Sequence, residues 1–372
     1  MAERKKVVLL GATGSIGQNT LRVIEQHAAQ FELLGIAANQ NAKALDEIAG
    51  RFSVPHKVLF TESGLDGLLE LATLPDADVV IVATTGTVGV KPTIAALEAG
   101  KTVGLANKET LVLAGEFVMP VARSCKGALL PVDSEHNAIF QCLEGMRDAK
   151  HLKRIILTAS GGPFLHHTKR ELEHVTLEDA LRHPNWDMGQ KVTIDSATMA
   201  NKGLEMIEAH WLFGADRDQI DVVIHPQSII HSMVEFMDGS VIAQMAPPSM
   251  TYPVQHVLTW PDKLPPTHQT MDFSRIHHLE LRPPDLQKFP CLRLAGEALA
   301  SGGLAPAVYN AANEVAVRAF IEGIISYSGI PELIETCLQK ADFVRPSNLD
   351  ELMVLEPQLN TFSESQLKTL TR

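Results

Sequence analysis

Two carboxylates stand close together in the stretch PVDSEHNAIFQ, residues 131–141. Asp133 and Glu135 follow the apolar run GALLPV, which is typical of a buried β-strand. Two like charges at this separation repel each other, and one tends to take up a proton unless a cation joins them. Carboxylate oxygens select a hard cation, so the pattern indicates Mg²⁺ or Mn²⁺. The alternative is a pair of ordinary solvated loop carboxylates.

A third carboxylate lies in TIDSATMANKGLEMIEAHWLF, residues 193–213. The pattern predicts a strand, a cap and an amphipathic helix, with Ser196 near the helix start, where free N–H groups attract anions. Asn201, Lys202 and Glu205 have the spacing of one helix face. That face offers a carboxylate to a metal and an Asn–Lys pair to a phosphate. The alternative is an exposed ion pair beside a capping serine, which contributes little stability.

Two loops could complete an anion pocket. LTASGGPF, residues 157–164, places Ser160 before two glycines, whose backbone N–H groups can surround an anion. RHPNWDMGQK, residues 182–191, combines His183, Trp186 and Met188 in a turn-rich segment, which suits a lid that excludes water. A loop held by one buried tryptophan is the alternative. His225 and the His-His pairs at 166–167 and 277–278 are interpreted as structural and surface residues, respectively.

A glycine loop near the N-terminus predicts a dinucleotide site. VVLLGATGSIGQNTLRVI places Gly11, Gly14 and Gly17 between a strand and a helix, so backbone N–H groups can approach a pyrophosphate. An NAD site should then show an acidic residue at the tip of the second strand. The tip here reads Asn39-Gln40-Asn41, without a carboxylate to repel a 2′-phosphate, so we expect NADP.

A polar trio follows another predicted strand. In LANKETL, residues 105–111, Asn107, Lys108 and Glu109 come directly after TVGLA. The carboxyl edge of an open α/β sheet is where such folds bind ligands. We therefore expect this trio at a ligand-binding edge, with a solvated loop as the alternative.

The elements that position these side chains indicate an α/β fold. Strand-like and helical runs alternate over the first 130 residues, which predicts a parallel, Rossmann-like sheet covered on both faces. From residue 151, RIILTAS, KVTID, DVVIHPQ and a hairpin around Asp238-Gly239 predict a mixed sheet, and the pattern after Pro290 is helical. We expect an NADP-binding domain (1–132), a central α+β catalytic domain (133–262) with a flap near 182–191, a proline-rich linker (263–290) and a C-terminal helical domain (291–372).

Composition narrows the class of protein. The chain of 372 residues has a net charge of −12, with 45% hydrophobic and 20% charged residues, so nucleic-acid or membrane-surface binding is disfavoured. Cys125, Cys142, Cys291 and Cys337 form no CxxC pair, which favours a reducing compartment. The apolar run before Gly11 is too short for a signal peptide. We expect a cytoplasmic protein.

The motifs together resemble one family, the 1-deoxy-D-xylulose 5-phosphate reductoisomerases of the non-mevalonate isoprenoid pathway. The resemblance covers essentially the whole chain and rests on GATGSIG, LANKETL, PVDSEHNAIFQ, LTASGGPF, HPNWDMGQK, TIDSATMANKGLEMIEAHWLF, HPQSIIHSMVEFMDGS and NAANEVAV, in the family's order. It implies NADPH- and metal-dependent rearrangement and reduction of 1-deoxy-D-xylulose 5-phosphate to 2-C-methyl-D-erythritol 4-phosphate. It also implies a homodimer.

The resemblance also implies residue roles. Asp133, Glu135 and Glu205 would bind Mg²⁺ or Mn²⁺, and Lys108 and His183 would join them as catalytic residues. The residues implied to contact the substrate are Ser134, Glu135, Ser160, His183, Trp186, Met188, Ser196, Asn201, Lys202, Glu205 and His231. Those implied to contact NADPH are Gly11, Thr13, Gly14, Ser15, Ile16, Gly17, Asn39, Gln40, Asn41, Asn107, Lys108, Glu109 and Gly189. Many members read Gly-Lys-Asn or Gly-Ser-Asn where this chain has Asn39-Gln40-Asn41.

Two other functions fit part of the sequence. A simple NADP-dependent dehydrogenase without rearrangement would not need three carboxylates around a metal. A non-enzymatic NADP-sensing protein would have no reason to keep a metal site and a phosphate pocket together. Activity in the presence of a chelator separates these alternatives.

Overall fold

The computed structural model describes residues 4–146, 149–186 and 188–370. Within it the chain divides into two compact units. The first unit comprises Met1–Leu111, Gly115–Gln141 and Ser249–Asp272, and the second comprises Val112–Ala114, Cys142–Pro248 and Phe273–Arg372. The four-part division expected from the sequence stays a prediction.

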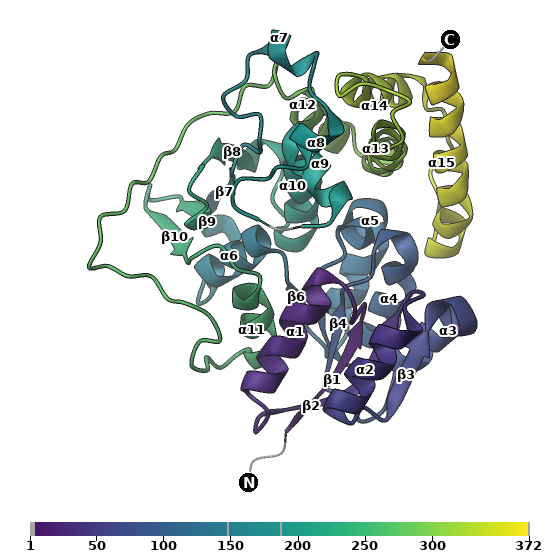
Figure 1. Ribbon diagram of the computed structural model, residues 1–372, viewed down its shortest axis with the longest axis vertical. Helices are drawn as coiled ribbons and strands as arrows, with labels where there is room; N and C mark the ends of the chain where they lie inside the picture. Colours follow the sequence, from purple (N-terminus) through teal and green to yellow (C-terminus); the bar gives the residue numbers. More distant parts are fainter. Residues whose placement is uncertain (1–3, 147–148, 187, 371–372) are drawn as a thin grey trace. The chain divides into compact units, whose positions relative to one another are not determined.

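The first unit is built on a six-stranded parallel sheet (Figure 1). Its strands are β1 (Lys5–Leu10), β2 (Phe31–Ala38), β3 (His56–Leu59), β4 (Val79–Val82), β5 (Thr102–Leu105) and β6 (Leu129–Pro131). Their order is β3-β2-β1-β4-β5-β6, so the direction of winding reverses between β1 and β4. The strand-like runs of the first 130 residues, which are KVVLL, ELLGIAA, KVLF, DVVIVAT, TVGLA and GALLPV, all contribute strands, and the Rossmann-like arrangement is confirmed. Ligands of such sheets bind beside this reversal, at the carboxyl ends of the strands.

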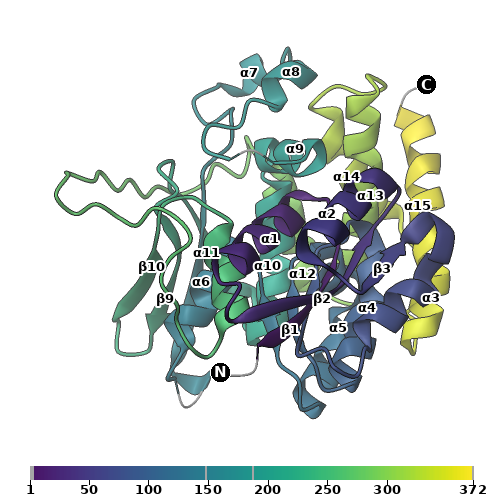
Figure 2. The same ribbon diagram turned by 60° about the horizontal axis from the view of Figure 1, so that its bottom comes forward.

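Helices cover both faces of this sheet, which explains its apolar strands. The helices of the unit are α1 (Ser15–Gln26), α2 (Ala42–Phe52), α3 (Phe60–Ala72), α4 (Val90–Glu98), α5 (Lys108–Ser124), α6 (Ser134–Leu143) and α11 (Thr251–Thr259). Side chains of α1, α2 and α11 share one apolar core with β1, β2 and β4, while α3 and α4 pack together against the sheet (Figures 1 and 2). Residues 7–10 of β1 are fully buried as a result.

One helix of the first unit comes from a distant part of the sequence. Helix α11 packs against α1, β5 and β6, and Lys5 at the start of β1 donates hydrogen bonds to the carbonyls of Leu258 (3.3 Å) and Trp260 (2.8 Å). A side chain at Gly104 on β5 would lie 2.7 Å from Val257 of α11. The helix therefore seats directly on the backbone of the sheet, and no sequence pattern indicated this return.

The second unit contains the predicted mixed sheet. Its strands are β7 (Leu152–Ala159), β8 (Ile220–Ile224), β9 (Ile230–Phe236) and β10 (Val241–Met245), in the order β10-β9-β7-β8. Strands β7 and β8 are parallel, whereas β9 is antiparallel to both β7 and β10. The hairpin around Asp238-Gly239 is confirmed, with Gly239 at a φ of 84°. The other elements are α7 (Lys169–Leu172), α8 (Leu177–Ala180), α9 (Gln190–Thr198), α10 (Ala200–Phe213) and a 3₁₀ turn (Arg217–Gln219).

The strand predicted at KVTID is wrong, because these residues belong to α9. Ser196 therefore lies in the last turn of a helix and not near the start of one, which also corrects its expected capping position. Met199 adopts a left-handed conformation (φ 60°) and separates α9 from α10. Burial of Thr193, Ile194 and Ala197 against neighbouring helices outweighs the strand preference of the β-branched residues.

Helices dominate the C-terminal part, as expected. They are α12 (Pro290–Ser301), α13 (Ala305–Ile321), α14 (Gly329–Lys340) and α15 (Leu349–Leu370), and α13, α14 and α15 pack against one another (Figure 1). Residues 263–289, all described, form no helix or strand apart from a single bridge between Arg282 and Ile224. Within the described residues, no helix combines the length and apolar character needed to cross a membrane.

Candidate active site

The glycine loop joins β1 to α1 by a close approach of backbones. Gly11 has a φ of 95°, and a Cβ atom there would lie 2.3 Å from the carbonyl oxygen of Ala83. A Cβ on Gly17 would lie 2.4 Å from the carbonyl oxygen of Gly11. Gly14, just before α1, has room for a side chain, since a Cβ atom there would lie 3.5 Å from its nearest neighbour. The loop therefore presents bare backbone at a helix N-terminus, where the residues fit a pyrophosphate.

The neighbouring loop residues lie where the sequence placed them. Ser15 is the first residue of α1, and Ile16 packs against the core of the first unit. Strand β2 ends at Ala38, and the exposed residues Asn39 and Gln40 form its tip. Asn41 caps α2 by accepting a hydrogen bond from the N–H of Ala44 (3.0 Å). The tip carries amides and no carboxylate, which is compatible with a 2′-phosphate.

Asn107 ties together the loops after β4 and β5. Its side-chain amide donates to the carbonyls of Thr84 (3.0 Å) and Gly86 (2.8 Å) and to Glu109 (2.8 Å). Its oxygen accepts from the N–H of Thr110 (3.0 Å), which caps α5. Asn107 is 2% exposed, so these bonds are shielded from water. This residue fixes the edge of the sheet, and Lys108 begins the helix directly after it.

The carboxylates of the DSE stretch lie at the start of α6, and the Asp133 side chain is mostly buried and not solvated. Asp133 accepts hydrogen bonds from the N–H groups of Glu135 (3.0 Å) and His136 (3.3 Å), as a capping residue does. The ammonium of Lys108 forms an ion pair with Asp133, and the Ser134 hydroxyl donates to Glu135. The Lys108 ammonium is thus a cationic group beside the two like charges. The structure brings four predicted site residues together: Lys108, Asp133, Ser134 and Glu135.

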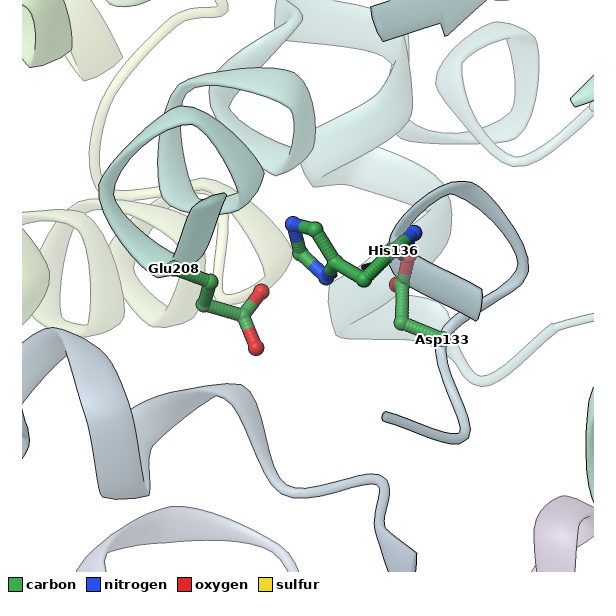
Figure 3. Close-up of side chains that lie close together, drawn as sticks. All are labelled: Asp133, His136 and Glu208. Carbon is green, nitrogen blue, oxygen red and sulfur yellow. Dashed lines mark hydrogen bonds and ion pairs between the residues drawn. The ribbon is translucent and has the colours of Figure 1, made fainter. Parts of the chain in front are cut away.

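His136 adds a buried imidazole beside Asp133. Its Nδ1 lies 3.4 Å from an Asp133 carboxylate oxygen, and the side chain is fully buried. Figure 3 shows both side chains leaving the turn that begins α6, and it also draws Glu208, a buried glutamate of α10. Sequence reasoning singled out neither His136 nor Glu208. Their positions in the sequence could have indicated them, since His136 comes one residue after Glu135 and Glu208 three residues after Glu205.

The predicted face of α10 is confirmed within the second unit. Asn201 and Lys202 each donate a hydrogen bond of 2.5 Å to a different oxygen of Glu205. Lys202 and Glu205 are only 4% and 1% exposed, so the ion pair is buried and not the exposed pair considered as the alternative. A buried charge pair of this kind is costly to separate. The side-chain oxygen of Asn201 (Oδ1) has no hydrogen-bond partner among the described residues, so it can accept a hydrogen bond from a ligand.

His183 and Ser160 form a hydrogen-bonded pair whose protonation follows from the contacts. His183 Nδ1 accepts from the N–H groups of Asn185 (3.2 Å) and Trp186 (3.0 Å), so the ring proton is on Nε2. Nε2 then donates to the Ser160 oxygen at 3.1 Å, which also accepts from the N–H of Gly162 (3.1 Å). Burial lowers the pKa of His183 to about 4, so the ring is neutral. The Ser160 hydroxyl keeps its hydrogen for another acceptor.

Four further predicted residues of the second unit are Trp186, Met188, Gly189 and His231. Trp186 lies against His231, with ring centroids 6.3 Å apart. Burial lowers the pKa of His231 to about 4, and its Nε2 has no hydrogen-bond partner within the described residues. Gly189 precedes α9, and the carbonyl of Met188 accepts from the Thr193 hydroxyl (3.4 Å). His231 is therefore buried yet keeps an unused nitrogen.

His225 is confirmed as structural, whereas His166 and His278 are exposed, as expected of surface residues. His225 is fully buried, and its Nε2 accepts from the N–H groups of Ile229 and Ile230, both at 3.1 Å. His167 packs edge-on against Phe164 (5.2 Å between ring centroids), and His166 is exposed. Both flank a cavity of about 440 Å³. Its other lining residues are Ser160, Gly162, Pro163, Phe164, Leu165, Asp179, Arg182, Pro184 and Pro226.

Comparison with known proteins decides the family. Three family models match. The model described as 1-deoxy-D-xylulose 5-phosphate reductoisomerase matches residues 7–63 and 56–115, its C-terminal domain matches 129–213, and the DXP reductoisomerase C-terminal domain matches 245–361. The chain belongs to the 1-deoxy-D-xylulose 5-phosphate reductoisomerase family.

Relatives and solved structures agree over the whole length of the chain. It is 48% identical to the 1-deoxy-D-xylulose 5-phosphate reductoisomerase of Pelotomaculum thermopropionicum (94% of this chain, 95% of the relative). It is 47% identical to that of Bacillus cereus strain Q1 (98% and 100%). The Zymomonas mobilis reductoisomerase in complex with NADPH superposes with a TM-score of 0.91 at 40% identity (98% and 99%). A DOX-P reductoisomerase in complex with NADPH, fosmidomycin and magnesium gives 0.92 at 36% identity (99% of each chain).

Proposed function

We infer that the protein catalyses the NADPH- and divalent-metal-dependent conversion of 1-deoxy-D-xylulose 5-phosphate to 2-C-methyl-D-erythritol 4-phosphate. The observation that carries this function is the end-to-end agreement with reductoisomerases, at 48% identity and at TM-scores above 0.9. The reaction rearranges the carbon skeleton of the substrate and reduces the resulting aldehyde with hydride. NADPH and Mg²⁺ are the cofactors, as in the solved complexes of the family.

We propose that the glycine loop and the carboxyl edge of the parallel sheet bind NADPH. The bare backbone between Gly11 and Gly17 fits the pyrophosphate, with Thr13, Ser15 and Ile16 alongside. The proposed ribose and nicotinamide contacts are Asn39, Gln40, Asn41, Asn107, Lys108, Glu109 and Gly189. The bonds of Asn107 to Thr84 and Gly86 support this placement, because they hold the loops of two adjacent strands in one geometry.

We propose that Asp133, Glu135 and Glu205 bind the divalent cation, with Mg²⁺ or Mn²⁺ equally suited to the donors. All three offer carboxylate oxygens, the donors that hard cations prefer. When bound, such a cation polarises substrate oxygens and stabilises developing alkoxide charge. Asp133 is held at the start of α6 by two backbone N–H groups, and Glu205 is held by Asn201 and Lys202. The chain thus orients each of these two carboxylates before any ligand arrives.

The phosphate of the substrate is assigned to Ser160, Ser196, Asn201 and Lys202. The Ser160 hydroxyl donates its hydrogen to a phosphate oxygen, since its own oxygen already accepts from neutral His183 and from Gly162. Lys202 supplies positive charge from a buried position. Phosphate binding at a distance from the reacting carbons contributes energy for orientation and loop closure.

Other side chains are assigned to the reacting end of the substrate and to its cover. Lys108 and Ser134 lie beside Asp133 and Glu135, where they can bind substrate hydroxyls or hold a proton. Trp186, Met188 and His231 form the cover that excludes water from the aldehyde. The Nε2 atom of His231, which has no partner within the described residues, forms a hydrogen bond with the substrate.

We also propose that the protein is a homodimer and is cytoplasmic. Support for the dimer comes from large apolar side chains that are exposed in the second unit: Met237, Val241 and Ile242 of the hairpin, and Phe273, Ile276, Leu279 and Leu281 of the extended segment. Large apolar side chains left exposed in this number are typical of an interaction surface. Light scattering should give a dimer for the protein and a monomer for Ile242→Lys. Val344→Lys, at a position that is 90% exposed and lies outside these two segments, is the control. The cysteine pattern and the short apolar run before Gly11 support the cytoplasmic location.

A direct assay tests the function. We would follow NADPH absorbance with 1-deoxy-D-xylulose 5-phosphate and added Mg²⁺, Mn²⁺ or chelator, and identify the product. Metal-dependent oxidation with a rearranged product is expected, and Glu205→Gln should abolish it, whereas Glu332→Gln on the exposed face of α14 should not. Oxidation that persists with chelator would favour a simple dehydrogenase, and absence of oxidation by a folded, NADPH-binding protein would favour the sensor.

A further inference from the structure

Residues of α13 and of the turn before α14 hold the short segment around Ser196, one on each side of this serine along the chain. Asn313 of α13 donates a hydrogen bond from its amide to Asp195 at 2.8 Å. Tyr327, two residues before α14, donates from its hydroxyl to the carbonyl of Ala197 at 2.7 Å. Asn313 and Tyr327 are 0% and 6% exposed. The residues before and after Ser196 are thus each fixed by a buried donor more than 100 positions later in the sequence.

Asp195 is the centre of a buried polar chain. Its side chain is almost fully buried, and it accepts from Asn313 and lies 3.0 Å from the ammonium of Lys191, one turn earlier on α9. Lys191 in turn lies 2.8 Å from Glu314, next to Asn313 on α13. Burial raises the pKa of Asp195, while Lys191 and Asn313 act in the opposite direction. Burial of a charged carboxylate is unfavourable unless partners compensate it. The partners of Asp195 on α13 therefore help to fix the position of α9.

A third contact reaches Ser196 from the glycine loop after β7. A Cβ atom on Gly162 would lie 2.8 Å from the carbonyl oxygen of Ser196 and 3.1 Å from the Cα of Ala197, and Gly162 has a φ of 65°. The N–H of the same glycine donates to the Ser160 hydroxyl. The Ser160 loop and the Ser196 turn are therefore in direct backbone contact, which leaves the end of α9 little freedom to move.

We propose that Asp195 and Asn313 are positioning residues that set the Ser196 hydroxyl for the substrate phosphate. The C-terminal helices carry no group of the proposed site. They then affect the reaction because they fix the position of the phosphate-binding turn. The inference rests on the proposed phosphate role of Ser196. A misplacement of about 1 Å at such a contact lowers an enzyme's efficiency by up to roughly 100-fold.

Exchange of the two side chains tests the bond itself. Asp195→Asn keeps the shape of the side chain and removes its charge, and Asn313→Asp places two carboxylates against each other. We expect each to raise KM for 1-deoxy-D-xylulose 5-phosphate about tenfold and to leave KM for NADPH within twofold. The double variant, with Asn at 195 and Asp at 313, rebuilds an amide–carboxylate bond and should recover most of the loss.

A matched control separates positioning from general stability. Asn310 lies one turn earlier on α13 and is 5% exposed, so Asn310→Asp also buries a new carboxylate in this helix. It should lower the melting temperature without raising KM for the phosphorylated substrate. If Asp195→Asn behaves in the same way, with a lower melting temperature and an unchanged KM, Asp195 is only structural and the proposal is overturned.

A second variant shows whether Asp195 acts through Ser196. In a Ser196→Ala background, Asp195→Asn should raise KM for the substrate little further, because the hydroxyl that it positions is gone. Fully additive effects would overturn the positioning role and leave the phosphate role of Ser196 intact. If Ser196→Ala alone leaves this KM unchanged, the phosphate role fails and the inference with it, while metal-dependent turnover by the unaltered protein still supports the reaction.

Discussion

Substitution of single glycines in the loop between β1 and α1 separates the contribution of this loop to stability from its contribution to NADPH binding. In Gly17→Ala the new methyl group would lie 2.4 Å from the carbonyl oxygen of Gly11 and 2.5 Å from that of Ala12. Overpacking of this kind costs about 1–3 kcal/mol, whereas alanine inside a helix regains up to about 1 kcal/mol. We therefore expect a net destabilisation of up to about 2 kcal/mol and a displaced loop.

Gly14→Ala is the matched comparison. Its methyl group would meet nothing closer than 3.5 Å, and a φ of −80° suits alanine, so the fold should be unaffected. Any loss of NADPH affinity in this variant reports on a pyrophosphate that approaches the backbone. We expect about a tenfold loss, which corresponds to ~1.4 kcal/mol.

Two measurements decide between these outcomes. Thermal unfolding should show a lower melting temperature for Gly17→Ala, by up to about 3 °C, and an unchanged one for Gly14→Ala. Titration of NADPH by its fluorescence should show weaker binding for both variants. A Gly17→Ala protein that melts and binds NADPH like the unaltered protein would refute the argument from close approach.

Three further predictions follow from individual contacts. Burial lowers the pKa of His231 from 6.5 to about 4, so between pH 6.5 and pH 4 the unfolded chain binds more protons than the folded one. The free energy of unfolding should therefore fall as the pH drops from 6.5 towards 4. Urea unfolding of His231→Gln should show a smaller fall over the same pH range. Asn39→Asp puts a carboxylate at the tip of β2, so the ratio of kcat/KM for NADPH over NADH should drop at least about tenfold; an unchanged ratio would place the 2′-phosphate elsewhere. Asn107→Ala removes a cap and two loop bonds, and urea unfolding should show a loss of about 2–3 kcal/mol, whereas a loss below about 0.5 kcal/mol would contradict its role.

The first unit was largely predictable because its signals are local. Continuous apolar runs and their turn residues indicated all six strands, and β2 ends at Ala38, where the argument for NADP required it to end. The spacing of Gly11, Gly14 and Gly17 between a strand and a helix is likewise a local pattern. The helical spacing of Asn201, Lys202 and Glu205 also sufficed to bring these side chains together.

Long-range contacts set the limit of prediction. The residues KVTID alternate like a strand, yet they form a helix because partners far along the chain bury one side of it, among them Asn313, 118 positions after Asp195. Sequence spacing likewise gave no reason to pair the Ser160 hydroxyl with His183, 23 positions later. Neither fact has a local pattern, because each depends on which distant elements pack together.

The seating of α11 on the first sheet bears on how the chain folds during synthesis. The apolar surface that Val254, Val257 and Leu258 cover stays exposed after β6 has been made, until the ribosome has added well over a hundred further residues. At about 5–20 residues per second this interval is on the order of 10 s. A nascent chain is therefore open to chaperones or aggregation during that window. Moving the segment 249–272 next to β6 by redesign of the chain order would shorten the window and should raise the yield of folded protein.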